Sequence, residues 1–355
     1  MRAEVAVVDG KNPDRGIIEK AGQILKNGGL VAFPTETVYG LGGNALDPEA
    51  SIKIYAAKGR PSDNPLIVHI AEMGSLEKIA ADIPEKARIL AGKYWPGPLT
   101  MILPKAAIVP GETTGGLDSV AVRFPSDPVA QALIRAAGGF VAAPSANTSG
   151  RPSPTRAEHV EEDLGDAIDM ILDGGPVGIG LESTIVDFTE KVPVVLRPGY
   201  ISLEMLEETL GEVRMDRGLL ITDENIRPKA PGMKYRHYAP AADLSVVEGP
   251  QEKVIAFINQ RAKEAAEAGG RTGIIATDET AGRYEEGIVR SIGSREEEEG
   301  IARHLYEVLR NFDSDQVSEI YSEAFYTPKM GQAIMNRLLK AAGHKVIHIP
   351  EEEEK

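Results

Sequence analysis

Hydrophobic residues recur at helical spacing in several stretches of the first two hundred residues. The clearest stretch is 14–28, where Ile17, Ala21, Ile24 and Leu25 lie near one helical face and two glycines end the pattern. A second stretch begins with Pro48, because proline is well tolerated in the first turn of a helix. We expect helices at about 14–28, 48–58, 75–94, 127–137 and 154–164.

Short apolar runs separate these helical stretches and have the character of buried strands. They are rich in Val, Ile and Leu and are bounded by glycine, proline or polar residues. The runs are 30–33, 65–70, 99–103, 119–124, 140–143, 170–172 and 183–188. This mixture predicts an α/β fold with a twisted mixed sheet and helices, extending over residues 1–210.

The pattern changes after residue 210. Residues 211–242 contain three prolines and little periodicity, so we interpret them as a long interdomain linker, and linkers of this length are usually functional. Strands and helices alternate over residues 243–350, which predicts a smaller C-terminal Rossmann-like α/β domain of uncertain role. Two domains also fit a length of 355 residues.

The composition is that of an ordinary soluble protein, with 42% hydrophobic and 26% charged residues. No stretch approaches the roughly 20 apolar residues of a membrane span, and the first residues do not have the pattern of a secretory signal. The absence of cysteine fits a reducing compartment. These features predict a cytoplasmic protein without a membrane partner.

The formal net charge of −15 is shared by both parts of the chain. Proteins that bind a nucleic-acid backbone usually carry a basic excess. An RNA-binding module is therefore the less favoured reading, and we expect direct tRNA binding to be weak or absent. Bulk charge does not forbid a locally basic pocket.

Several familiar catalytic motifs are missing. The chain has neither a Walker-type GxxxxGK[ST] loop nor a GxSxG elbow, and GIGLES at 178–183 has serine where the third glycine of a dinucleotide fingerprint belongs. The chain has no cysteine and its six histidines are mostly far apart in sequence, so no metal bound by the protein alone is expected. A nucleotide would have to bind to a less common architecture.

Cations, hydroxyls and amides gather where apolar strands end. Lys58 and Arg60 lie at the C-terminus of a predicted helix, and Arg123 and Arg197 lie at strand ends. On its own the Lys58–Arg60 pair could equally be a charged helix cap. Four such cations on an otherwise acidic domain predict a pocket for several negative charges, such as a triphosphate and a carboxylate.

Two further features have a plain alternative. The segment APSANTSGRPSP places Ser145, Asn147 and Ser153 among glycine and proline, which is typical of a turn-rich loop but also of a loop that holds phosphate or ribose. His69 lies in an apolar strand, where a histidine is more often a core residue than a ligand-binding one.

Together these segments resemble the threonylcarbamoyl-AMP synthase family, whose catalytic unit is the YrdC-like domain. The continuation to residue 350 resembles the family's long two-domain form, so the resemblance covers nearly the whole chain. Any one string would be weak evidence, but seven in the family's order are highly specific. The matching strings are PTETVYGLGGNA, KGRPSDNPLIVHI, WPGPLT, VAVRFP, PSANTSGRPSPT, ESTIVD and LRPG.

The resemblance implies that L-threonine, bicarbonate and ATP, with Mg2+ on the phosphates, give threonylcarbamoyl-AMP and pyrophosphate. A separate transferase machinery then modifies tRNA. The implied catalytic residues are Lys58 and Arg60. The implied threonine-binding residues are Thr37, His69, Arg123, the backbone at Ala143, and Ser183. The implied ATP-binding residues are Arg60, Asn64, Ser119, Ser145, Ser153 and Arg197.

The linker motif KYRHYAP is a candidate active-site lid, formed by Tyr235, Arg236, His237 and Tyr238. Its alternative is a plain tether between the domains. A second alternative concerns the reaction, since hydrogenase-maturation proteins that embed a YrdC-like domain carbamoylate a different target. Those proteins carry cysteine motifs, and this chain has no cysteine.

Overall fold

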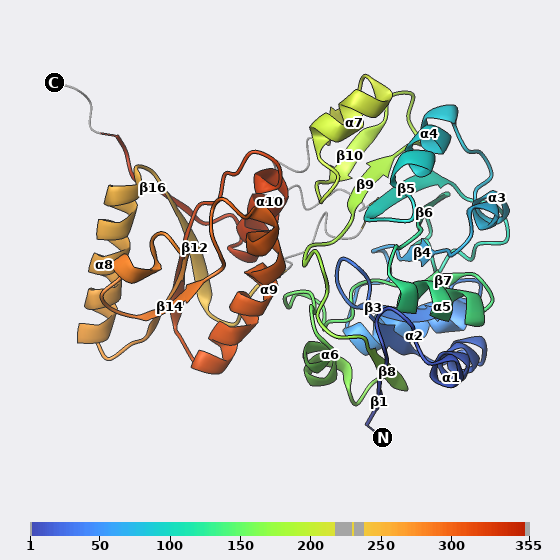
Figure 1. Cartoon of the computed structure of the whole chain (residues 1–355), viewed down its shortest axis with the longest axis horizontal. Coiled ribbons are helices and arrows are strands. Elements are labelled where there is room, and N and C mark those ends of the chain that lie inside the picture. Colours follow the sequence, from blue (N-terminus) through green and yellow to red (C-terminus); the bar gives the residue numbers. More distant parts are fainter. Residues whose placement is uncertain (1, 217–228, 231–237, 352–355) are drawn as a thin grey trace. The chain divides into compact units, whose positions relative to one another are not determined.

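The structure of the protein is a computed structural model that describes residues 2–216, 229–230 and 238–351 (Figure 1). The chain forms two compact units. The first comprises residues 1–149 and 153–235, and the second comprises residues 150–152 and 236–355. Three of the proposed lid residues, Tyr235, Arg236 and His237, lie outside the described residues.

The first unit contains an eleven-stranded sheet that combines parallel and antiparallel strand pairs, so the predicted mixed sheet is confirmed. Its order is not the chain order, so segments far apart in sequence become neighbours. From one edge to the other the strands are β1 (Glu4–Val7), β8 (Met170–Asp173), β2 (Val31–Phe33), β3 (Gly40–Asn44), β7 (Val141–Ala142), β4 (Ile67–His69), β6 (Ser119–Arg123), β5 (Leu99–Pro104), β9 (Thr184–Asp187), β10 (Val194–Arg197) and β11 (Arg214–Met215).

Several helices of the first unit begin after a side chain that accepts a hydrogen bond from a free amide of the first turn. Asp14, Asp47 and Asp127 each accept such a bond. The predicted helix at 75–94 is interrupted near Pro84, because proline cannot continue the hydrogen-bond ladder of the preceding turn. The helices are α1 (Arg15–Lys26), α2 (Pro48–Lys58), α3 (Leu76–Ile79), α4 (Glu85–Tyr94), α5 (Pro128–Ala136), α6 (Ala157–Leu164) and α7 (Leu203–Leu210).

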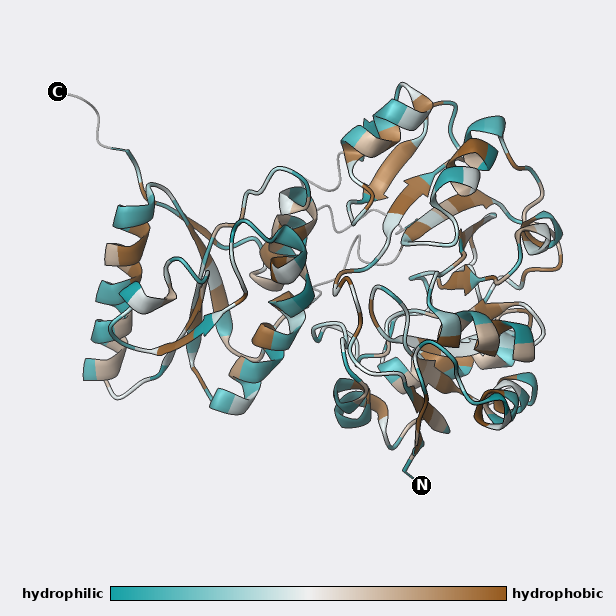
Figure 2. Ribbon diagram, in the orientation of Figure 1, coloured by the Kyte–Doolittle hydropathy of each residue, from teal (hydrophilic) through white to brown (hydrophobic). Residues whose placement is uncertain are grey.

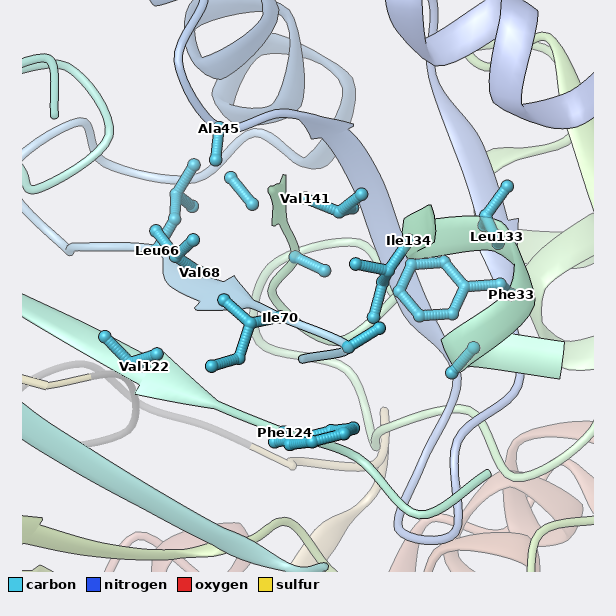
Figure 3. Packing of buried hydrophobic residues seen from close by; sticks show 14 of the residues in the cluster. Phe33, Ala45, Leu66, Val68, Ile70, Val122, Phe124, Leu133, Ile134 and Val141 are labelled. Atoms are coloured by element: carbon cyan, nitrogen blue, oxygen red, sulfur yellow. The ribbon is translucent and has the colours of Figure 1, made fainter. Parts of the chain in front are cut away.

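The two faces of the central strands pack against different partners. Val68 and Val122 point into the main core, where they pack with Phe33 and Ile134 of other elements (Figure 3). Because side chains alternate along a strand, the neighbouring residues point the other way. Five of these strand residues form a separate apolar cluster with Ala230, and we call the side of the sheet that bears this cluster the front face. The cluster consists of Ile67, Ile102, Ala121, Ile185, Leu196 and Ala230.

The second unit is an α/β layer structure with a parallel five-stranded sheet. Figure 1 shows α8 (Gln251–Glu267) on one side of this sheet and α9 (Glu298–Asp315) and α10 (Gly331–Ala341) on the other. The strand order places the first strand between the fourth and the fifth, which differs from the usual Rossmann order. The order is β14 (Ile288–Ser291), β13 (Thr272–Ala276), β15 (Glu319–Glu323), β12 (Asp243–Glu248) and β16 (Val346–His348).

Hydropathy follows the layers within each unit. Figure 2 shows brown, hydrophobic strands and helices that carry teal, hydrophilic residues on one side. None of the helices in the described part of the chain combines the length and apolar character that crossing a bilayer would need.

Candidate active site

Arg123 ends strand β6 and is almost fully buried, with 4% of its surface exposed. Its Nη1 donates to Thr37 Oγ1 at 2.8 Å, and its Nη2 lies 2.8 Å from Glu36 Oε1. The carboxylate of Glu36 thus balances the guanidinium charge. The Arg123 cation was predicted from the sequence, but its partner Glu36 was not.

His69 lies beside Arg123 in the parallel pairing of β4 and β6. Its Nδ1 is 3.1 Å from the carbonyl oxygen of Ile67, and its ring meets Phe33 edge to face. Burial, and secondarily the Arg123 cation, lower the pKa of His69 to about 3. The ring is therefore neutral at any working pH, so it can form hydrogen bonds but cannot supply a positive charge.

Ser183 lies just before β9 and joins two other strands. Its Oγ is 2.8 Å from Thr100 Oγ1 on β5, and Arg197 Nη2 on β10 donates to the same oxygen at 3.1 Å. Arg197 Nε also donates to the Ser183 carbonyl at 3.0 Å. Since Thr100 pairs directly with Arg123 across β5 and β6, this network is adjacent to the Arg123 side chain.

The residues expected to hold threonine therefore occupy neighbouring positions of one sheet. His69 and Arg123 are register partners, and Thr37 contacts Arg123. Ala143 follows β7, and its amide donates to the Ile67 carbonyl on β4 at 2.9 Å. Five distant segments of the chain are thus brought close together around strands β4 and β6.

Lys58 is the last residue of α2 and is 2% exposed. Its Nζ donates to the carbonyl oxygen of Ser145 at 2.6 Å and also to that of Asn147. The Ser145 hydroxyl donates to Asn147 Oδ1 at 2.6 Å. The lysine is more than a helix cap, because it fixes the loop that begins at Ser145.

Arg60 and Asn64 lie at the opposite end of strand β4 from His69. Arg60 is 8% exposed, and its guanidinium donates to the backbone carbonyls of Asn64 at 3.1 Å and Pro65 at 3.0 Å. Ser119 opens β6 on the same side, four residues from Arg123, which is about 13 Å of extended chain. These three predicted nucleotide contacts therefore lie at the opposite end of strands β4 and β6 from His69 and Arg123.

Ser153 and Arg197 complete the predicted ATP contacts. Ser153 is fully buried and donates to Glu182 Oε1 at 2.5 Å. Glu182 immediately precedes Ser183, and Arg197 hydrogen-bonds to Ser183 itself. These two predicted nucleotide residues thus contact the segment 182–183, which contains the predicted threonine-binding residue Ser183.

Tyr238 is the one residue of the proposed lid that the structure describes. It has a positive φ of 65° and is 5% exposed. Its ring stacks on Tyr306 of α9, within the second unit, with centroids 5.1 Å apart. These contacts leave the lid prediction untested.

Several buried side-chain atoms in the described residues form no hydrogen bond, and two of them lie at the two ends of the site. Arg123 Nε is a donor at the threonine end, and Asn64 Oδ1 is an acceptor at the nucleotide end. Buried polar atoms in proteins are normally paired. We therefore interpret both as groups that await a ligand, the first an acceptor such as a carboxylate and the second a donor such as an amino group.

Sequence reasoning did not find Glu36, Thr100 or Glu182 as parts of this site. Glu36 and Glu182 each stand within a matching string, and each is the single carboxylate flanked by threonine or serine in its segment. Thr100 carries no such signal, because it looks like one more residue of an apolar strand. Its importance comes only from the strand pairing.

Comparisons with known proteins cover nearly the whole chain. A family model described as "Telomere recombination" matches residues 23–199, and one described as "Threonylcarbamoyl-AMP synthase, C-terminal domain" matches residues 201–343. The threonylcarbamoyl-AMP synthase of Bacillus subtilis is 49% identical over 97% of this chain and 98% of its own, and that of Pyrococcus abyssi is 48% identical over 94% and 96%. The crystal structure of P. abyssi Sua5 complexed with L-threonine superposes with a TM-score of 0.92 at 46% identity, covering 98% of this chain and 99% of that one.

The mixed sheet, with its buried cations and hydroxyls at strand ends and a second α/β unit, defines the class as a two-domain α/β enzyme with a YrdC-like catalytic domain. The matches extend through both units at high identity. The chain belongs to the threonylcarbamoyl-AMP synthase family.

Proposed function

We propose that the protein condenses L-threonine, bicarbonate and ATP to threonylcarbamoyl-AMP and pyrophosphate, and so acts as a nucleotidyltransferase. The observation that supports this most directly is that different polar groups lie at the two ends of strands β4 and β6. Groups suited to an amino acid lie at their carboxyl ends, and groups suited to a nucleotide lie at their amino ends. The unpaired Arg123 Nε and Asn64 Oδ1 mark those two ends.

The reaction consists of two bond-forming steps. The threonine amine attacks the carbon of bicarbonate, and water leaves, which gives a carbamate. A carbamate oxygen then attacks the α-phosphorus of ATP while the bond to the bridging oxygen of the β-phosphate breaks and pyrophosphate leaves. Neither step needs a protein nucleophile, so orientation, charge neutralisation and exclusion of water are the main tasks of the protein.

The threonine end is suited to hold a zwitterion. Arg123 can donate its Nε hydrogen to the substrate carboxylate, with the Thr37 hydroxyl beside it. Glu36 already balances the Arg123 charge, so the substrate gains a directed hydrogen bond more than a net Coulomb attraction. His69 is neutral and buried, which suits it to shape the site and to orient the substrate by hydrogen bonding.

The nucleotide end provides the positive field for the reacting phosphates. We assign this role to Lys58 and Arg60, the two cations at and just beyond the end of α2. Lys58 also fixes the Ser145–Asn147 loop, so its removal should disturb both charge and geometry. Asn64 would accept a hydrogen bond from the nucleotide through its unpaired Oδ1.

Magnesium would enter this reaction with the triphosphate. Among residues 2–216, 229–230 and 238–351, no group of three His, Asp or Glu side chains could hold a metal ion. Mg2+ at nucleotide sites commonly keeps several waters and phosphate oxygens as ligands, so such a group is not required. When bound, the ion neutralises phosphate charge during transfer.

The product has a mixed anhydride between a carbamate and a phosphate, which water destroys. Transfer to tRNA must therefore follow quickly, and we assign that step to a separate transferase, with this protein binding tRNA weakly or not at all. The net charge of −15 supports weak tRNA binding, because an acidic protein is repelled by the phosphate backbone. The cysteine-free composition fits a cytoplasmic location, where the acceptor tRNA is found.

An omission experiment tests the proposed function. The whole chain is incubated with threonine, bicarbonate, Mg2+ and ATP, and each component is left out in turn. We expect pyrophosphate and a threonine-containing AMP adduct only in the complete mixture. An adduct that forms without threonine, or pyrophosphate release independent of bicarbonate, would contradict the proposal.

A further inference from the structure

Lys229 lies in the linker but is bound to the catalytic sheet. Its Nζ is 3.1 Å from Asp187 Oδ2 and 3.2 Å from Glu190 Oε1. The Asp187 side chain, at the carboxyl end of β9, is only 1% exposed. Partial burial would lower the pKa of Lys229, but the two carboxylates outweigh burial and raise it. The lysine is thus charged and paired with a buried carboxylate.

Ala230, the next residue, is inserted into the front face of the sheet. It has no exposed surface and belongs to the apolar cluster with Ile67, Ala121 and Ile102. His69 and Arg123 lie two residues after Ile67 and Ala121, and Thr100 lies two residues before Ile102. Side chains two residues apart in a strand share a face, so the site residues lie on the front face as well. Lys229 and Ala230 therefore lie on the face of the sheet that bears the site residues.

The register of the strands shows which end of the site this contact covers. Asp187 pairs with Ile102, and Ile102 pairs with Ala121. The next front-face residue of β6 beyond Ala121 is Ser119 at the nucleotide end, whereas Arg123 lies in the other direction. The Lys229–Asp187 pair is thus displaced from the threonine end toward the nucleotide end.

We propose that Lys229 and Asp187 are positioning residues for ATP. Their ion pair holds Lys229 and Ala230 against the front face, and this short segment forms part of the wall of the nucleotide end. The inference rests on the proposed function, since it assigns the amino ends of β4 and β6 to ATP. It gives Lys229 and Ala230 a defined task that involves only residues within the first unit.

The test is a steady-state comparison of Lys229→Met with the wild-type full chain, in which the threonine and ATP concentrations are varied separately. We expect KM for ATP to rise about tenfold, with KM for threonine and kcat changed by no more than about twofold. Lys229→Arg should bring KM for ATP back to within about threefold of wild type, because arginine can also pair with Asp187.

Lys191→Ala provides the matched control. Lys191 is an exposed lysine next to Glu190, so its removal changes the local charge equally without touching Asp187. We expect its kinetics to match those of the wild type. A double-mutant cycle with Asp187→Asn should show that the second substitution adds little once Lys229 is gone.

Several outcomes would overturn the inference. An unchanged KM for ATP in Lys229→Met would do so, as would equal increases in both KM values or the same effect in Lys191→Ala. Failure of the proposed function is distinguishable from these, because the wild-type chain would then form no threonine-dependent adduct at all.

Discussion

The hydroxyl oxygens of Thr100 and Ser183 lie 2.8 Å apart in the buried interior of the first unit, although 83 residues separate them in the chain. Thr100 pairs with Arg123 on one side, and Ser183 accepts a hydrogen bond from Arg197 on the other. One short contact thus links the strand partner of Arg123, a predicted threonine-binding residue, to the hydroxyl that Arg197, a predicted ATP-binding residue, contacts.

Thr100→Val should therefore weaken threonine binding. Valine keeps the shape of threonine but removes the hydroxyl, so Ser183 loses one of the partners that fix its orientation. We expect KM for threonine to rise about five- to twentyfold, with a loss of about 1 kcal/mol in the free energy of unfolding. Steady-state kinetics and urea denaturation measure the two quantities.

Thr184→Val is the control for this substitution. Thr184 is also fully buried, but its hydroxyl donates to the Ile201 carbonyl, away from the arginines. We expect a comparable loss of stability with KM for threonine little changed. If both variants raised that KM equally, the effect would be general loosening of the sheet and not orientation of Ser183.

Lys58→Met should nearly abolish adduct formation. The substitution removes a buried ammonium group and releases the carbonyls of Ser145 and Asn147. We expect kcat to fall at least about a hundredfold, the size of loss seen when a charge-stabilising group is removed from an active site. Pyrophosphate release measures the rate.

Lys53→Met tests whether any carbonyl-binding lysine on α2 would behave alike. Lys53 lies on the same helix and donates to the carbonyl of Gly28 at 2.7 Å, outside the site. Its replacement should leave kcat within about twofold of wild type while costing a similar amount of stability, about 1 kcal/mol. Full turnover in Lys58→Met would show that the site has been assigned wrongly.

Asp127 should make the stability of the first unit depend on pH. Burial raises the pKa of Asp127 to about 6, and the nearby Glu36 carboxylate adds to that rise although the amide of Ala130 opposes it. Between about pH 4 and 6 the folded state holds a proton that the unfolded state has lost, so stability falls as pH rises through this window. The full cost above pH 6 is on the order of 3 kcal/mol.

Asp127→Asn should remove this dependence. Asparagine caps a helix as well as aspartate does, so the bond to the Ala130 amide is retained without the charge. We expect the variant to be more stable than wild type at pH 7.5 and equal to it near pH 4, as measured by urea denaturation. The same difference at both pH values would contradict the raised pKa.

Gly199 of the LRPG string allows two backbone segments to approach closely. A Cβ at this position would lie 2.5 Å from the Thr184 amide nitrogen and 2.9 Å from the Glu182 carbonyl oxygen, which no real side chain permits. Gly199→Ala should therefore displace residues 182–184, lower the free energy of unfolding by more than about 2 kcal/mol and raise both KM values. Gly74→Ala, where a Cβ meets nothing within 4 Å, should have no effect on either.

Much of the fold could be predicted because short sequence patterns indicate where individual helices and strands begin and end. Helix α2 begins and ends where the prediction placed it, since Pro48 and Gly59 are strong start and stop signals. Strand β3 was missed, because its sequence GLGGN lacks the branched residues that indicate a strand. Its glycines instead allow close packing against Phe33 and Val141.

The sequence by itself determined the membership of the family, the mixed α/β character and the residue types of the site, because these are written in short contiguous strings. Only the tertiary structure decided which of these groups meet. The pairing of Arg123 with Glu36, the contact of Thr100 with Ser183 and the burial of Ala230 depend on the strand order β2-β3-β7-β4-β6-β5-β9. That order results from burying apolar faces over long chain separations, and no local periodicity encodes it.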